Sequence, residues 1–186
     1  MMWNRSSKKS SKEKFTSAQQ AYDCALDLLS YRDFSKQKMQ ERLQQKGADE
    51  EQAQQALTKL QEYGLINDER YAQRVYEGWL NKRCYGRQHL AAELSKRGIG
   101  PELSQQVLAQ FTPELEEQQA ANAAELFLQR HRAKLALLED ESLDFKARLA
   151  LRNKIYAAAG RFMAARGFSS RYTQILWEKL QVNTDI

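Results

Sequence analysis

The chain carries the stretch FSKQKMQERLQQKG at residues 34–47 and, 51 positions later, the stretch YGRQHLAAELSKRG at residues 85–98. An aromatic residue opens both stretches, apolar residues occupy the sixth and tenth positions of both, and a cation followed by glycine closes both. The correspondence continues on either side without a gap, beginning at the pair Ala21 and Ala72. A gapless repeat of this length predicts two copies of one supersecondary unit, which is typical of binding along an extended partner.

Three helices are expected in each copy. In the first copy, apolar residues at helical spacing predict a helix over 17–30, and Ser35 is suited to cap a second helix over 36–46. Gly47 ends that helix, and the acidic residues 49–51 favour the start of a third helix that runs to about residue 63. The second copy repeats this order, with helices expected over 67–80, 87–97 and 101–111.

A third copy is looser and longer. Its opening apolar pattern follows that of the second copy by 48 residues, whereas Arg166–Gly167 follows Arg97–Gly98 by 69 residues. The difference places about 21 additional residues, near 132–151, between its first two helices. The helices of this copy are expected from Pro113 to about residue 131, over 152–166, and from Ser169 or Ser170 to about residue 180.

These units predict an all-α protein in which three tandem three-helix repeats form an elongated, curved array. Stacking is expected because no short helical triplet can bury its apolar stripe alone. The expected divisions are a disordered basic tail at 1–18 and repeats at 19–65, 66–111 and 112–182, the last with its insertion near 132–151.

The composition excludes several classes of protein. The net charge is +5, with basic segments alternating with acidic ones, and no apolar stretch is long enough to span a membrane. The N-terminus lacks a secretory signal, so we expect a cytoplasmic protein. The two cysteines, Cys24 and Cys84, lack metal-ligand spacing, and His89 and His131 lack partners for chemistry. We therefore expect no catalytic residues, no metal and no cofactor.

The turn before the second helix of the second copy is the first candidate binding site. Lys82, Arg83 and Arg87 surround a helix start, where guanidinium and backbone N–H groups can bind phosphate. Tyr85 can stack on an unpaired base. The alternative is structural, because Tyr85 corresponds to Phe34 and an aromatic kept in both copies can fill a helix junction.

A terminal basic patch is the second candidate, formed by Arg161, Arg166 and Arg171 in the third copy. Here too a structural role is open for Arg166. Like Lys46 and Arg97, it precedes a glycine that ends a helix, where a cation is favoured by the helix dipole.

Three spaced groups of residues resemble the RecX family of regulatory proteins, over about residues 20–180. The motifs are YGLINDERYA at 63–72, Lys82–Arg83, Tyr85–Gly86, Glu93–Leu94 and KRGI at 96–99, with Arg32, Phe34–Ser35 and Leu43 before them and Arg161–Phe162 and Arg166–Gly167–Phe168 after them. The tail and the insertion have no firm place in the family pattern.

The resemblance implies a cytoplasmic modulator of the RecA recombinase. Such a protein binds RecA and its filament on DNA, and it inhibits filament growth, ATPase, strand exchange and coprotease activity. It thereby tempers recombination in DNA repair and the SOS response. The resemblance also implies binding to single- or double-stranded DNA, and we expect a monomer.

Two other functions remain open. One is a stand-alone DNA-binding protein of the helix-turn-helix type, which would bind DNA tightly without RecA and with sequence preference. The other is an adaptor with no nucleic-acid role, in which reversal of the charges at Arg83 and Arg87 would leave function intact.

Overall fold

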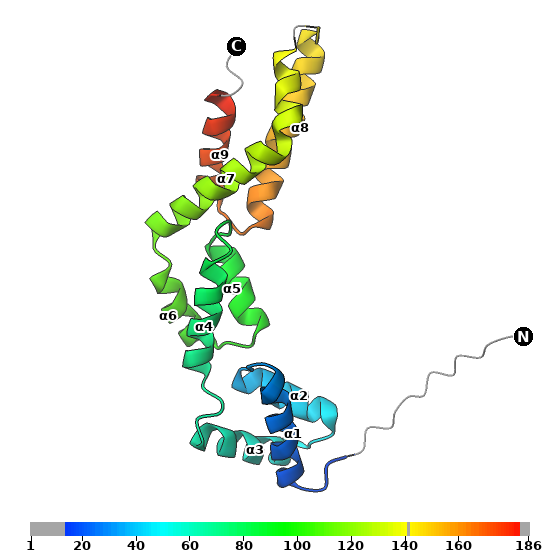
Figure 1. Ribbon diagram of the computed structural model, residues 1–186, viewed down its shortest axis with the longest axis vertical. Helices are drawn as coiled ribbons and strands as arrows, with labels where there is room; N and C mark the ends of the chain where they lie inside the picture. The colour runs from blue at the N-terminus through cyan, green and yellow to red at the C-terminus, as the bar shows by residue number, and fades with distance from the viewer. Residues whose placement is uncertain (1–13, 141, 183–186) are drawn as a thin grey trace, which may run out of the picture. The chain divides into compact units, whose positions relative to one another are not determined.

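The computed structural model describes residues 14–140 and 142–182, which form α-helices and one short 3-10 helix with no strand among them (Figure 1). The predicted all-α class is therefore confirmed for the described part of the chain. Most of the predicted N-terminal tail, residues 1–13, lies outside it. The chain divides into two compact units, Met1–Tyr71 and Ala72–Ile186.

The first unit contains one helical triplet, formed by α1 (Ala18–Tyr31), α2 (Lys36–Lys46) and α3 (Glu50–Glu62). Side-chain oxygens of Ser17, Ser35 and Asp49 accept hydrogen bonds from backbone N–H groups in the first turns of these helices, as cap residues do. The core between the helices includes Ala21, Ala25, Met39, Leu43, Leu57 and Leu60. Each helix agrees with its predicted range to within about one residue at either end.

The second triplet comprises α4 (Asp68–Leu80), which begins in the last residues of the first unit, α5 (Arg87–Lys96) and α6 (Pro101–Gln110). Aromatic side chains hold it together. The Trp79 ring packs edge-on against Phe111 with 5.1 Å between centroids, and its Nε1 donates to Nδ1 of His89 at 2.9 Å. The Tyr76 hydroxyl donates to the carbonyl of Gln110 at 3.1 Å, which ties α4 to the end of α6.

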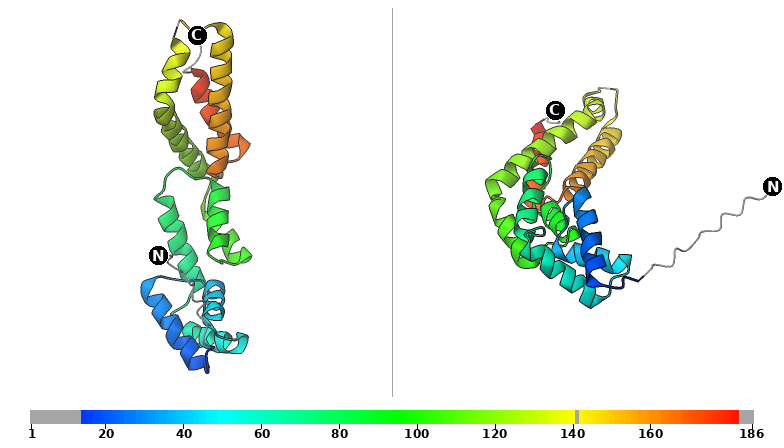
Figure 2. Two further views of the ribbon diagram at one scale, coloured as in Figure 1. Left: turned by 90° about the vertical axis from the view of Figure 1, so that its right-hand side faces the viewer. Right: turned by 60° about the horizontal axis from the view of Figure 1, so that its bottom comes forward.

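The third triplet comprises α7 (Pro113–Ala136), the 3-10 helix η1 (Leu137–Glu139), α8 (Phe145–Ala165) and α9 (Ser170–Val182). The predicted helix limits at residues 131 and 152 are wrong, because the additional residues lengthen α7 and α8. Leu135 and Leu151 continue the apolar pattern and pack against the core of this triplet, so both helices extend almost to the acidic turn. Figure 2 shows α7 and α8 as a long hairpin, and α9 packs against both.

The glycines predicted to end the middle helices have the expected backbone conformation. Gly47, Gly98 and Gly167 have φ angles of 121°, 72° and 76°, in the region that side-chain-bearing residues rarely adopt. Each triplet therefore ends its second helix by the same local device, which supports the repeat inferred from the sequence.

Candidate functional site

The predicted turn between α4 and α5 lies against the end of α8. The Tyr85 ring has the Lys82 ammonium 5.9 Å from its centroid and the Arg166 guanidinium carbon 5.8 Å from it. The structure thus brings together Lys82, Tyr85 and Arg166, which come from the two candidate sites of the sequence. We call these three side chains the Tyr85 cluster.

Two glycines make this approach possible. The N–H of Gly86 donates to the carbonyl of Arg166 at 2.9 Å, and the N–H of Gln88 donates to the carbonyl of Gly167 at 3.2 Å. A Cβ atom on Gly86 would lie 2.5 Å from the Gly167 oxygen, and one on Gly167 would lie 2.2 Å from the nitrogen of His89. Only glycine fits at either position, so the Tyr85 cluster depends on direct contact between two backbones.

Arg166 is the most constrained cation of the cluster. Its guanidinium carbon lies 3.5 Å from the centroid of the Phe162 ring, and its Nε is buried without a hydrogen-bond partner among the described residues. Burial lowers the pKa of Arg166, which the neighbouring Tyr85 raises and the positive charge of Arg130 lowers. The group remains a cation at neutral pH, because the ordinary pKa of arginine lies far above 7.

Tyr85 is half-buried, and its ring lies 4.2 Å from the ring of His89, centroid to centroid. Burial lowers the pKa of His89, and the charge of Lys82 lowers it further. A neutral His89 fits its role as hydrogen-bond acceptor for Trp79. These contacts give Tyr85 the junction-filling position that its match to Phe34 suggested, while two cations also lie within 6 Å of its ring centroid.

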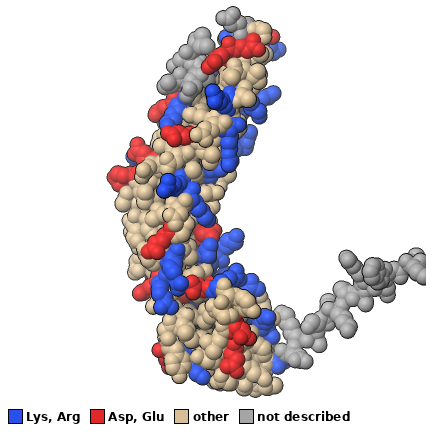
Figure 3. Space-filling view, viewed as in Figure 1, with Lys and Arg blue, Asp and Glu red and all other residues tan. Residues whose placement is uncertain are grey.

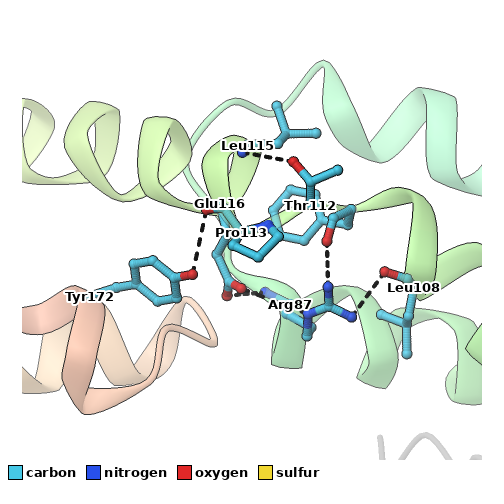
Figure 4. A network of polar contacts seen from close by, with 8 residues as sticks. Arg87, Leu108, Thr112, Pro113, Leu115, Glu116 and Tyr172 are labelled. Carbon is cyan, nitrogen blue, oxygen red and sulfur yellow. Dashed lines mark hydrogen bonds and ion pairs between the residues drawn. The ribbon is translucent and has the colours of Figure 1, made fainter.

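Arg87 is held by contacts within the chain (Figure 4). Its Nη1 donates to the carbonyl of Leu108 at 2.9 Å, and its Nη2 donates to the carbonyl of Phe111. The carboxylate of Glu116 accepts from the backbone N–H of Arg87 at 2.8 Å and lies 3.8 Å from its Nε. Arg87 therefore joins the ends of α5, α6 and α7, and we leave it out of the binding surface for which it was predicted.

The remaining predicted cations are exposed. Arg83 follows α4 with a φ of 55°, which is unusual for a residue other than glycine. Arg161 lies on α8, and the guanidinium carbon of Arg171 lies 5.6 Å from the centroid of the Tyr172 ring. Arg166 and Arg171 thus contact different aromatic rings, and Arg166 belongs with Tyr85.

The sequence prediction missed an acidic contact that occurs twice. Asp68, in the first turn of α4, accepts a hydrogen bond from the backbone N–H of Lys36 at 2.8 Å. Glu116, in the first turn of α7, makes the same contact with Arg87 at 2.8 Å. The acids are 48 residues apart and the donors 51, which are the spacings of the repeats. Each of these acids caps the middle helix of the preceding triplet, whereas Asn67 accepts from Arg70 at the start of α4.

The described residues contain no group of three or more His, Cys, Asp or Glu side chains that can hold a metal ion. In the same part of the chain, every helix is too short or too polar to span a bilayer.

Comparison with known proteins follows the same division into triplets. Family models for the first and second three-helix domains of RecX match residues 21–60 and 67–108. The chain is 33% identical over 167 residues to a regulatory protein RecX of Trichlorobacter lovleyi, covering 88% of this chain and 99% of the relative. It is 41% identical over 83 residues to a RecX of Syntrophotalea carbinolica, covering 45% and 46% of the two chains.

A solved structure supports the fold independently. The crystal structure of RecX from Lactobacillus salivarius matches with a TM-score of 0.65 and 22% identity, covering 89% of this chain and 97% of the other. At that identity the match shows the fold alone, and it extends across all three triplets.

Proposed function

Because this chain belongs to the RecX family of regulatory proteins, we propose that it binds RecA and the RecA filament on DNA and inhibits filament growth. Lower RecA ATPase, strand-exchange and coprotease activities follow, which would moderate recombination and the SOS response. The observation that carries the proposal is the 33% identity with a regulatory protein RecX across 88% of this chain.

The proposed contact surface is built around the Tyr85 cluster. Lys82 of the cluster and Arg83, which follows it in the sequence, are exposed, so they can meet an acidic protein surface or a phosphate group without moving the backbone. Arg161 and Arg171 are further exposed cations of the third triplet that we assign to the same function.

The proposed mechanism is occupancy without chemistry by this chain. Three triplets in one chain can each contribute a modest contact, and linkage makes the second and third contacts effectively intramolecular. A chain bound to adjacent RecA subunits would block the addition of subunits or favour their loss.

The helix-turn-helix alternative receives less support. A recognition helix places its N-terminal residues against the bases, beside phosphates. The last helices of the first two triplets begin with acidic residues, which are Glu50 and Glu51 in α3 and Glu102 in α6. Negative charge at those positions repels a DNA backbone.

The ATPase of preformed RecA filaments on single-stranded DNA tests the proposal, measured with and without this protein in stoichiometric amounts. We expect turnover to fall. Unchanged turnover together with tight, sequence-selective binding to bare duplex DNA would replace the proposal with the helix-turn-helix alternative.

A further inference from the structure

Helix α8 carries several cations and no acidic residue. The cations are Lys146, Arg148, Arg152, Lys154 and Arg161. Figure 3 shows Lys and Arg side chains gathered along the side of the second unit on which α8 lies. Arg148 donates to the carbonyl of Asp140 at 3.0 Å, whereas the other four make no ion pair or hydrogen bond with the described residues. The helix therefore presents positive charge that the described part of the chain does not neutralise.

Three of these cations share the solvent-facing side of α8. With about 100° of rotation per residue, Lys146, Lys154 and Arg161 fall within about 80° of one another, opposite the buried Ile155 and Met163. They extend over about 22 Å of helix at roughly even intervals of two turns. The exposed residues between and beside them are Ala147, Ala150, Asn153, Ala157, Ala164 and Ala165.

The chemistry of this face favours a polyanion over a protein partner. Protein interfaces depend on large apolar or aromatic anchors, and lysine is depleted from their centres. The only small apolar groups exposed on this face are the methyl groups of alanines, since the exposed Phe145 and Leu149 lie more than about 100° from its centre. Short side chains allow a stiff backbone to come close, and cations about 11 Å apart along the face can each neutralise a separate phosphate.

We propose that this side of α8 binds the phosphodiester backbone of nucleic acid without sequence preference, through Lys146, Lys154 and Arg161. The surface lies in the lengthened hairpin of the third triplet and is separate from the Tyr85 cluster. The inference rests on the proposed function in one respect, which is that the nucleic acid bound in the cell is the DNA held in the RecA filament. Binding to bare DNA nevertheless tests it without RecA.

The test uses the full-length triple variant K146Q/K154Q/R161Q, because glutamine keeps the helix propensity of the replaced residues. Fluorescence anisotropy with a labelled oligothymidylate and a labelled duplex of mixed sequence gives the affinity at several salt concentrations. We expect the affinity to fall at least about tenfold at about 0.1 M salt, and the slope of log affinity against log salt to become shallower by about 2 to 3 for the duplex. A loss with one probe only would identify which form of DNA the surface binds.

The matched control is R42Q/K46Q/K96Q, which removes the same net charge from exposed positions outside α8. Equal losses in both variants would overturn the proposal, because net charge alone would then explain the binding. Unchanged DNA affinity in the α8 variant would overturn it too, and weaker inhibition of RecA in that case would assign the face to a protein contact. If the α8 variant alone loses DNA binding while wild-type protein leaves RecA turnover unchanged, this inference holds and the proposed function fails.

Discussion

Single glycines decide whether the second and third triplets can meet as they do. Gly86 and Gly167 place backbone against backbone, and the Tyr85 cluster forms only because nothing larger separates the two turns. Arg166 and Arg87 have different roles: Arg166 belongs to the proposed contact surface, whereas Arg87 is structural. Arg166 faces Tyr85 and Phe162, while the donors of Arg87 are used on the carbonyls that end α6.

Replacement of either glycine should therefore destabilise the second unit. We expect Gly86→Ala and Gly167→Ala each to lower the free energy of unfolding by at least about 2 kcal/mol, because the new Cβ overlaps a backbone atom and, at Gly167, the left-handed conformation is strained as well. Urea unfolding followed by circular dichroism measures the change. Gly78→Ala is the control, since nothing lies within 4 Å of its added Cβ and alanine in a helix should add about 0.5–1 kcal/mol. Equal stability in all three variants would contradict the close approach.

His89 should make the stability of the protein depend on pH. Burial lowers the pKa of folded His89 below the unfolded value of about 6.5. The unfolded chain therefore binds the proton at a higher pH than the folded chain does. The free energy of unfolding that neutral His89 supports above about pH 6.5 is lost as the pH falls below that value. We expect the drop in melting temperature from pH 7.5 to 5.5 to be smaller in His89→Asn, whose side-chain oxygen can still accept from Trp79. An equal drop in wild type and variant would exclude His89 as the titrating group.

At the scale of helices, the acids at the start of α4 and α7 cap the middle helices of the triplets that precede them in the sequence. The carboxylates of Asp68 and Glu116 bind the first N–H of α2 and α5, where the positive end of the helix dipole adds to the hydrogen bond.

Loss of these caps should loosen the start of the preceding helix. We expect Asp68→Ala and Glu116→Ala each to cost about 1–2 kcal/mol of stability, the range for lost helix caps. Hydrogen exchange should accelerate at the backbone N–H of Lys36 in the first variant and of Arg87 in the second. Glu117→Ala is the control, because Glu117 is exposed beside Glu116, and it should leave the exchange of Arg87 unchanged. Unaltered hydrogen exchange in the two cap variants would show that Asp68 and Glu116 do not stabilise the starts of α2 and α5.

The parts of the fold that depend on neighbouring residues could be predicted from the sequence. Ser17, Ser35 and Asp49 act on N–H groups three residues away, and the glycines that end the middle helices act through their own φ angles. The acid caps span about 30 residues and the Tyr85 cluster about 80, and spacing alone does not show which side chains meet at such a distance. The helix limits on either side of the insertion were wrong because helix-like spacing does not distinguish a new helix from an extended one.

At the scale of the whole molecule, three helical triplets follow one another, and the third has longer first and second helices than the other two. The first two triplets match family models for RecX domains, and the third combines the shared plan with a long α7–α8 hairpin. Similarity to a regulatory protein RecX extends over 88% of the chain. We propose that this chain regulates RecA by occupying the filament, with the Tyr85 cluster and its exposed neighbours as one point of contact.

Filament growth tests this claim most directly. RecA assembly on fluorescently labelled single-stranded DNA should be slowed by the wild-type protein and restored toward the unregulated rate by K82Q/R83N. Asparagine is chosen at residue 83 because it tolerates the left-handed backbone found there. The control R42Q/K96Q loses the same charge at exposed positions and should inhibit like wild type. Unchanged filament growth at saturating wild-type protein would contradict the account, and full inhibition by K82Q/R83N would remove the Tyr85 region from it.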